Sequence, residues 1–259
     1  MSNQNGSNSS APAELSRVLT LRSLVFYGIA FIIPLAFFTT YGIVTNTTHG
    51  HVSMTYVVAT LCMVFTAYSY CRMSKAFPSS GSVYAYATET FNPYIGFIAG
   101  WTIVLGYMFL PMLNYLASAI FMQAALPSIP LWVWVVLFTV IVTGANLLGI
   151  KVADIFNNVV VIIQLIFLVI LLIMTIRYIT GHDLAINMSA FYNSEEFANM
   201  GGVKGIASGA AIVCLAYLGF DGIAALGEEA IEPKKNIPKA LMICCIGVGA
   251  MYVIFTYLL

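Results

Sequence analysis

Seven apolar stretches, each long enough to cross a lipid bilayer, dominate this sequence. A spanning α-helix needs about 20 predominantly apolar residues, and such stretches occur near 22–45, 54–73, 95–125, 131–149, 153–178, 203–228 and 237–259. Only 8% of the residues are charged, whereas a soluble domain is about a quarter charged. The stretches therefore predict an all-α polytopic membrane protein with seven transmembrane helices.

The apolar stretches divide the chain into four regions. We expect a disordered cytoplasmic tail over 1–20, because its first part is rich in Ser, Asn and Gly. Transmembrane helices 1–5 then occupy 21–178, an extracellular loop covers 179–202, and helices 6 and 7 fill 203–259. The chain closes on an apolar run at Leu259 with no charged anchor, so we expect a truncated piece of a longer protein.

The distribution of basic residues predicts the orientation in the membrane. With the N-terminus inside, the outer side receives only Arg177 and Lys204. The cytoplasmic side receives Arg17, Arg22, Arg72, Lys75, Lys151, Lys234, Lys235 and Lys239. Because cytoplasmic loops carry the excess of Lys and Arg, we expect a cell-membrane (plasma or inner membrane) protein with a cytoplasmic N-terminus and lipid as its main surroundings.

Composition also bears on which ligands and chemistries to expect. The net charge is zero, so nothing indicates nucleic acid. The three His show no metal-ligand spacing, and the five Cys read as small packing residues, with a redox or metal role as the alternative. No His or Asp lies at a spacing from Ser82 that would make this serine the activated nucleophile of an enzyme. We expect no metal, no cofactor and no enzyme activity.

The first and sixth stretches contain residues that interrupt helices. Pro34 follows Gly28 near the middle of the first stretch, and Gly219 and Gly222 flank Asp221 in the sixth. Paired interruptions at corresponding positions are typical of inverted-repeat transporters, where they build the substrate site. The interruptions fall in spans one and six, which predicts a five-plus-five repeat; the alternative is a pair of kinks with packing roles only.

Acidic residues near the second interruption are candidates for binding, coupling or gating. A carboxylate at the bilayer centre costs about 2.5–3.5 kcal/mol on insertion scales, so Asp221 needs a bound cation, a proton or freed amides, unless it lies hydrated near the interface. Glu228 and Glu229 follow about two turns later. They could relay a proton or hold a cytoplasmic gate, or pair with Lys234, Lys235 or Arg72.

The backbone before Pro34 and one aromatic residue complete the candidate site. We expect the amides of Ile29, Ala30 and Phe31 to be freed where the helix opens, and freed N–H groups attract a carboxylate. This predicts a solute with an anionic group. Tyr107 in the third stretch either lines the cavity or is an ordinary packed aromatic.

Several segments together resemble the amino acid–polyamine–organocation transporter superfamily, and particularly bacterial putrescine importers. Those segments are Tyr41-Gly42-Ile43-Val44, Gly50-His51-Val52, Phe77-Pro78 with Gly81-Ser82 and Tyr84-Ala85-Tyr86, Gly96-Phe97, Gly100-Trp101, Tyr107 to Met112, Trp132 to Val136, Ala216 to Asp221, Glu228-Glu229 and Ile237-Pro238-Lys239-Ala240.

The resemblance implies a LeuT-like inverted-repeat fold of which seven helices are present. It implies a secondary active transporter that imports an amino acid or polyamine, usually by proton symport with alternating access. The implied substrate-binding residues are Ile29, Ala30, Phe31, Tyr107, Tyr217, Gly219, Phe220 and Asp221. Asp221, Glu228, Glu229 and Gln164 are the implied coupling or gating residues.

Three departures from the pattern bear on the substrate and the coupling ion. The first break reads Gly28-Ile29-Ala30 instead of a glycine-rich triplet. Gln164 stands where many members have a coupling Lys. Putrescine importers have acids at the positions of Gly106 and Thr39, which argues for a zwitterionic amino acid over a diamine. Sodium coupling, exchange, and an inactive membrane fragment or interaction subunit remain alternatives.

Overall fold

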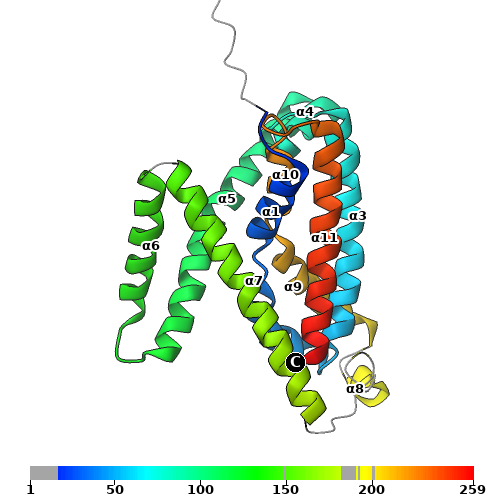
Figure 1. Cartoon of the computed structure of the whole chain (residues 1–259). Coiled ribbons are helices and arrows are strands. Elements are labelled where there is room, and N and C mark those ends of the chain that lie inside the picture. The colour runs from blue at the N-terminus through cyan, green and yellow to red at the C-terminus, as the bar shows by residue number, and fades with distance from the viewer. Residues whose placement is uncertain (1–16, 149, 182–190, 192, 200–201) are drawn as a thin grey trace, which may run out of the picture.

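The computed structural model describes residues 17–148, 150–181, 191, 193–199 and 202–259, and these residues form helices, turns and one isolated β-bridge. The helices, drawn in Figure 1, are α1 (Leu21–Ile32), α2 (Ala36–Thr48), α3 (Val52–Ala76), α4 (Ser82–Thr90), α5 (Pro93–Ala125), α6 (Leu131–Leu147), α7 (Ile150–Gly181), α8 (Ser194–Asn199), α9 (Val203–Val213), the 3₁₀ turn η2 (Cys214–Tyr217), α10 (Gly222–Ala225) and α11 (Pro233–Leu258).

The predicted all-α polytopic membrane fold is confirmed. Five helical segments are long and apolar enough to span a membrane, and the bent pair α1 and α2 makes a sixth. The fourth predicted span is the exception, because α6 has 17 residues and is about 26 Å long at 1.5 Å per residue. That is short of the roughly 30 Å hydrocarbon thickness.

Helix starts follow local capping chemistry. The Asn92 side chain accepts a hydrogen bond from the Ile95 N–H at 2.9 Å, and Pro93 fills the first position of α5, where a missing N–H costs nothing. Thr20 caps α1 in the same way through the Ser23 N–H. These caps place the starts of α5 and α1 within two residues of the predicted spans.

The buried core lies among the first, second, sixth and seventh spans. Figure 1 shows α11 (red) and α3 (cyan) side by side, with α1 and α9 against them. Buried side chains from α1, α2, α3, α9, η2, α10 and α11 form one hydrophobic cluster, joined by Leu168 of α7. In contrast, most of α5 is exposed, and only Gly96 and Ala119 are buried there.

The first span is broken, as predicted. Helices α1 and α2 meet at a bend of 45° across residues 33–35. Pro34 has no N–H and disfavours helical backbone in the residue before it, and Ile33 accordingly has φ 54°. The interruption predicted from Pro34 is confirmed, about one turn after Gly28.

The sixth span is also interrupted, as predicted. Helix α9 tightens into the 3₁₀ turn η2 and ends at Tyr217, and helical structure resumes only at Gly222. Gly219 between them has φ 100°, which a residue with a Cβ adopts only at a cost. The segment Val203–Ala225 is still long and apolar enough to span a membrane as one piece, so the interruption is a local unwinding rather than a sharp bend.

The segment before α1 is held against the segment after α10. Leu19 and Ala230 form a parallel β-bridge, and the N–H groups of Val18 and Leu19 both donate to the Glu229 carbonyl at 2.9 Å. Residues 1–16 of the expected tail lie outside the described residues, whereas 17–20 have defined positions. The expected disorder of the tail stays a prediction.

Replacing Gly219 by Ala should strongly reduce the yield of folded protein. An added Cβ would collide with the Phe31 carbonyl group, and the φ of 100° is itself strained for alanine, which costs about 1–3 kcal/mol before the collision is counted. Size-exclusion chromatography and a thermal melt in detergent measure the loss.

Gly42→Ala provides the matched control for this substitution. Gly42 lies within α2, and no atom comes within 4 Å of the place that an added Cβ would take, so the melting temperature of this variant should stay the same or rise slightly. Equal stability of the two variants would show that the contact at Gly219 does not hold the breaks together.

Candidate functional site

The two interrupted spans contact each other at their breaks. A Cβ on Gly219 would overlap the carbonyl group of Phe31. A Cβ on Gly222 would lie 2.9 Å from Cδ2 of the Phe31 ring, closer than side-chain carbon atoms normally approach. Glycine at both positions therefore lets the unwound part of the sixth span lie directly on the last turn of α1.

A third glycine brings α1 close to α10 and α11. Gly28 is helical and buried in α1, and a Cβ there would meet the Ile223 side chain and, at 2.6 Å, the Cys244 Sγ. Gly28 therefore serves close packing and does not itself form the break.

One tyrosine of α11 is hydrogen-bonded to both breaks. The Tyr252 hydroxyl lies 3.0 Å from the Ala216 carbonyl of the sixth span and 3.3 Å from the Ile33 carbonyl of the first. Tyr252 is fully buried, and its ring contacts Tyr56 and Tyr217 edge-on. The single hydrogen of Tyr252 can thus serve the Ala216 carbonyl, which the interruption removes from helical hydrogen bonding, while the Ile33 carbonyl also accepts from the Ala36 N–H at 2.8 Å.

Beside the breaks, the hydroxyl of Tyr107 is hydrogen-bonded to Asp221, the acidic residue that was predicted to lie deep in the membrane. The Tyr107 hydroxyl of α5 donates to Oδ2 of Asp221 at 3.1 Å. Asp221 is partly buried, and Tyr107 is 46% exposed. A carboxylate has about four acceptor positions, so one hydrogen bond from a hydroxyl leaves room for further donors. The pair therefore offers a positioned and partly accessible carboxylate to a cation.

Backbone groups at the two breaks have different polarity. Among the described residues, the N–H groups of Leu35, Gly219 and Asp221 take part in no backbone hydrogen bond. Helix α1 in turn ends at Ile32, and the last turn of a helix leaves carbonyl oxygens without intrahelical partners. The end of α1 is therefore the partly negative end of that helix.

This polarity corrects the predicted role of Ile29, Ala30 and Phe31. The expectation that their amides are freed is wrong, because α1 continues through Ile32 and these three residues lie in its final turn. Their carbonyl side, which favours cations, is what the end of α1 presents. A contact between these residues and a solute stays a prediction.

Two predicted residues of the sixth span pack against protein. Tyr217 is fully buried, and its hydroxyl is 2.6 Å from the Thr60 hydroxyl of α3. Phe220 is 6% exposed and packs edge-on against Tyr70 of α3, with ring centroids 5.2 Å apart. The structure thus brings Phe31, Gly219, Asp221 and Tyr107 together, while Tyr217 points toward α3.

Gln164 lies on α7, away from the Tyr107–Asp221 pair. Its Oε1 is buried and has no hydrogen-bond partner among the described residues. The next residue, Leu165, lines an apolar cavity of about 160 Å³ together with Ile29 and Pro34. Helix α7 therefore flanks the first break, and the coupling role of Gln164 stays a prediction.

Glu228 and Glu229 have different surroundings. Glu228 and Ser80 exchange two hydrogen bonds: the Ser80 N–H donates to Glu228 Oε1, and the Glu228 N–H donates to Ser80 Oγ, both at 3.3 Å. The Glu229 side chain makes no hydrogen bond within the described residues. Glu228 thus links the turn after α10 to the loop before α4.

The alternative network of Glu228 and Glu229 with basic residues is absent from the described part of the chain. The ion pair found there joins Lys235 to Glu232, at 3.1 Å between exposed side chains three residues apart. Within the described residues, Glu228 and Glu229 form no ion pair with Lys234, Lys235 or Arg72.

Sequence reasoning missed Tyr252, Tyr70 and Ser80. Tyr252 lies in an apolar run with nothing in its local sequence to mark it, and only the three-dimensional packing places it at both breaks. Ser80 lies in the segment Phe77-Pro78-Ser79-Ser80-Gly81, which predicted a turn and a short helix but not a contact with Glu228.

Comparison with known proteins identifies a family and several relatives that are named as importers, transporters or permeases. A family model described as "Amino acid permease" matches residues 23–259. The low-affinity putrescine importer PlaP of Escherichia coli strain K12 is 34% identical over 249 residues, which is 95% of this chain and 54% of the importer.

Two Bacillus subtilis proteins are more distant. The methylthioribose transporter is 29% identical over 93% of this chain and 55% of its own length. The branched-chain amino acid permease BcaP is 27% identical over 94% of this chain and 54% of its own length. The chain spans about half the length of these relatives.

The apolar helices, the two contacting interruptions and the family match over nearly the whole chain lead to one assignment. This chain is a multi-pass membrane protein that belongs to the amino acid permease family.

Proposed function

We propose that this chain contributes the solute site of a secondary active transporter that imports an amino acid or polyamine across the cell membrane. The observation that carries the proposal is the hydrogen bond from Tyr107 to Asp221 beside two contacting helix breaks. A small solute with an ammonium group would bind the Asp221 carboxylate, and alternating access would expose it to each side in turn.

The polarity at the breaks supports an ammonium group as the recognised part of the solute. The carboxylate of Asp221 and the C-terminal end of α1 both favour positive charge. Amino acids and polyamines share a primary ammonium group. The relatives, named as an importer of putrescine, a transporter of methylthioribose and a permease of branched-chain amino acids, support solute transport in general.

We further propose proton symport, with the N-terminus in the cytoplasm. What supports symport is the resemblance of the sequence to a superfamily whose members usually import their solute with a proton. Symport requires the proton and the solute to be bound together, so the proton would be carried at a group other than the carboxylate that holds the ammonium ion. In this orientation, the Ser80–Glu228 contact lies on the cytoplasmic side.

Asp221→Asn should abolish uptake while the protein still inserts into the membrane. Tyr107→Phe should lower uptake about tenfold or more, since a hydrogen bond to a charged group contributes about 1.5–3 kcal/mol. Uptake of labelled putrescine and of labelled branched-chain amino acids into cells expressing each variant measures the effect, normalised to membrane protein.

Tyr94→Phe is the control for the loss of a hydroxyl on α5. Tyr94 is 84% exposed and should tolerate the change with normal uptake. Wild-type uptake by Asp221→Asn would remove this carboxylate from transport and refute the proposed site.

Glu228→Ala should lower the maximal uptake rate about threefold with little change in half-saturating concentration. The substitution removes one of the two hydrogen bonds between Glu228 and Ser80. Because this hydrogen bond is exposed to solvent, it contributes only about 0.5–1 kcal/mol. Glu229→Ala, whose side chain lacks such a bond, should transport at the wild-type rate. A larger defect in Glu229→Ala than in Glu228→Ala would show that the Ser80–Glu228 contact is not what sets the transport rate.

Replacing sodium by choline in the uptake buffer should leave transport unchanged. An inward proton gradient should raise the initial rate, and a protonophore should remove the increase. Loss of uptake in choline would instead establish sodium coupling, and uptake that depends only on internal solute would establish exchange.

A further inference from the structure

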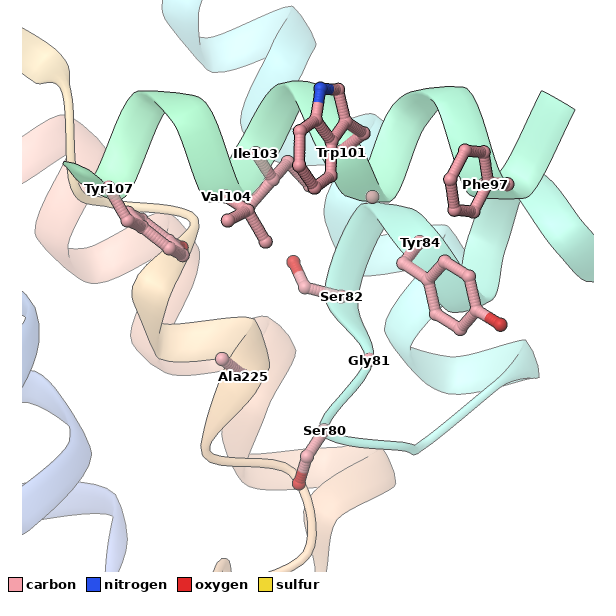
Figure 2. Close-up of a pocket in the computed structure, with 11 residues that line it drawn as sticks. Ser80, Gly81, Ser82, Tyr84, Phe97, Trp101, Ile103, Val104, Tyr107 and Ala225 are labelled. Atoms are coloured by element: carbon pink, nitrogen blue, oxygen red, sulfur yellow. The ribbon is translucent and has the colours of Figure 1, made fainter. Parts of the chain in front are cut away.

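A cavity of about 410 Å³ lies between the start of α4, the first half of α5 and the end of α10. Figure 2 shows its aromatic wall, formed by Phe97, Trp101 and Tyr107 of α5 and by Tyr84 of α4. The proposed function uses two residues at its edge, Tyr107 and Ser80, but not the space itself. It borders the Tyr107–Asp221 pair on the side of α4.

One buried polar atom of the cavity has no partner. Ser82 is 5% exposed, and its hydroxyl makes no hydrogen bond with any described residue. Figure 2 shows this hydroxyl directed into the space bordered by Val104, Tyr107 and Ala225. A buried hydroxyl without a partner loses its hydrogen bonds to water and gains nothing in return, and a polar group bound in the cavity would recover that loss.

Both ends of the cavity lead to a carboxylate. At one end, the Tyr107 hydroxyl is bonded to Asp221. At the other end, Ser80 is bonded to Glu228 through two hydrogen bonds. The residues that line the cavity carry no charge of either sign, so the two carboxylates beside it are the nearest charges shown. The local charge therefore favours a cation over an anion.

The aromatic wall favours the same class of ligand. The ring faces of Trp, Tyr and Phe carry partial negative charge and attract ammonium groups, most strongly where water is excluded. The wall is otherwise apolar and can cover a short alkyl chain. A hydroxyl acceptor, aromatic faces and flanking carboxylates together match an alkylammonium ion.

We propose that this cavity is a second solute site that binds a primary alkylammonium ion, with the ammonium group on the Ser82 hydroxyl and the alkyl chain against Trp101. The inference rests on the proposed function, because the same solute would occupy this cavity after leaving Asp221 on its way to the α4 side. Ser82 and Trp101 then determine specificity at a position separate from the helix breaks.

Equilibrium binding to the purified protein in nanodiscs tests the site. The probe is labelled putrescine, with n-butylamine and butyrate as competitors. Butylamine should compete and butyrate should not. Ser82→Ala should weaken putrescine binding about tenfold, because one hydrogen bond to a charged group is lost, and Trp101→Leu should weaken it about threefold, because the aromatic face is lost.

Ser79→Ala is the matched control. Ser79 also has a buried hydroxyl without a partner among the described residues, but it does not line the cavity, so its binding should equal that of the wild type. A thermal melt separates binding from folding: Ser82→Ala removes an unsatisfied buried group and should melt at the same temperature or higher.

The outcomes distinguish this inference from the proposed function. Three results would overturn the second site, even where Asp221-dependent uptake is intact. They are absence of amine binding, competition by butyrate equal to that by butylamine, and equal binding by Ser82→Ala and the wild type. Binding that depends on Ser82 in a protein that accumulates no solute supports the site and refutes transport.

Discussion

The close contact between two interrupted helices is the constraint on which the rest of the structure depends. Lipid cannot hydrogen-bond the main-chain groups that an interruption leaves open, so both breaks must be covered by protein or by a watered cavity. Here each break covers the other, because Gly219 and Gly222 allow backbone to lie on Phe31. Any side chain at these positions would separate the two spans.

The contact between the two breaks places negative charge around them. Helix α1 ends at the break with its carbonyl groups, and Asp221 lies at the opposing break with its carboxylate held by Tyr107. Farther toward α4, Glu228 adds a second carboxylate near Ser80. The described residues that line the cavity between these points are aromatic, aliphatic or small, so negative charge is concentrated where a small cation can reach it.

Much of this arrangement could be predicted from the sequence because single residues enforce it. Pro34 cannot continue a helix, and glycines around Asp221 permit unwinding, so both interruptions were predictable. Asp221 and Tyr107 were both candidates, and the structure joins them.

Features that depend on tertiary packing could not be predicted in the same way. The freed groups at the first break were assigned wrongly because one turn of additional helix reverses their polarity at Phe31. The hydrogen-bond partners of Tyr217 and Tyr252 lie far away in the sequence. A local sequence pattern cannot predict hydrogen bonds between such distant residues. Hydrophobic periodicity reports which segments are helical, but inside a membrane it does not report which face meets which neighbour.

The bridge made by Tyr252 has a mechanical consequence. Its hydroxyl carries a single hydrogen, yet two carbonyl oxygens from different spans lie within 3.0 and 3.3 Å of it. The hydrogen can pass from one acceptor to the other by a small rotation about the C–O bond. The Ile33 carbonyl also accepts a hydrogen bond from the Ala36 N–H at 2.8 Å, so the hydroxyl can turn to Ala216 without leaving the Ile33 carbonyl bare in the bilayer.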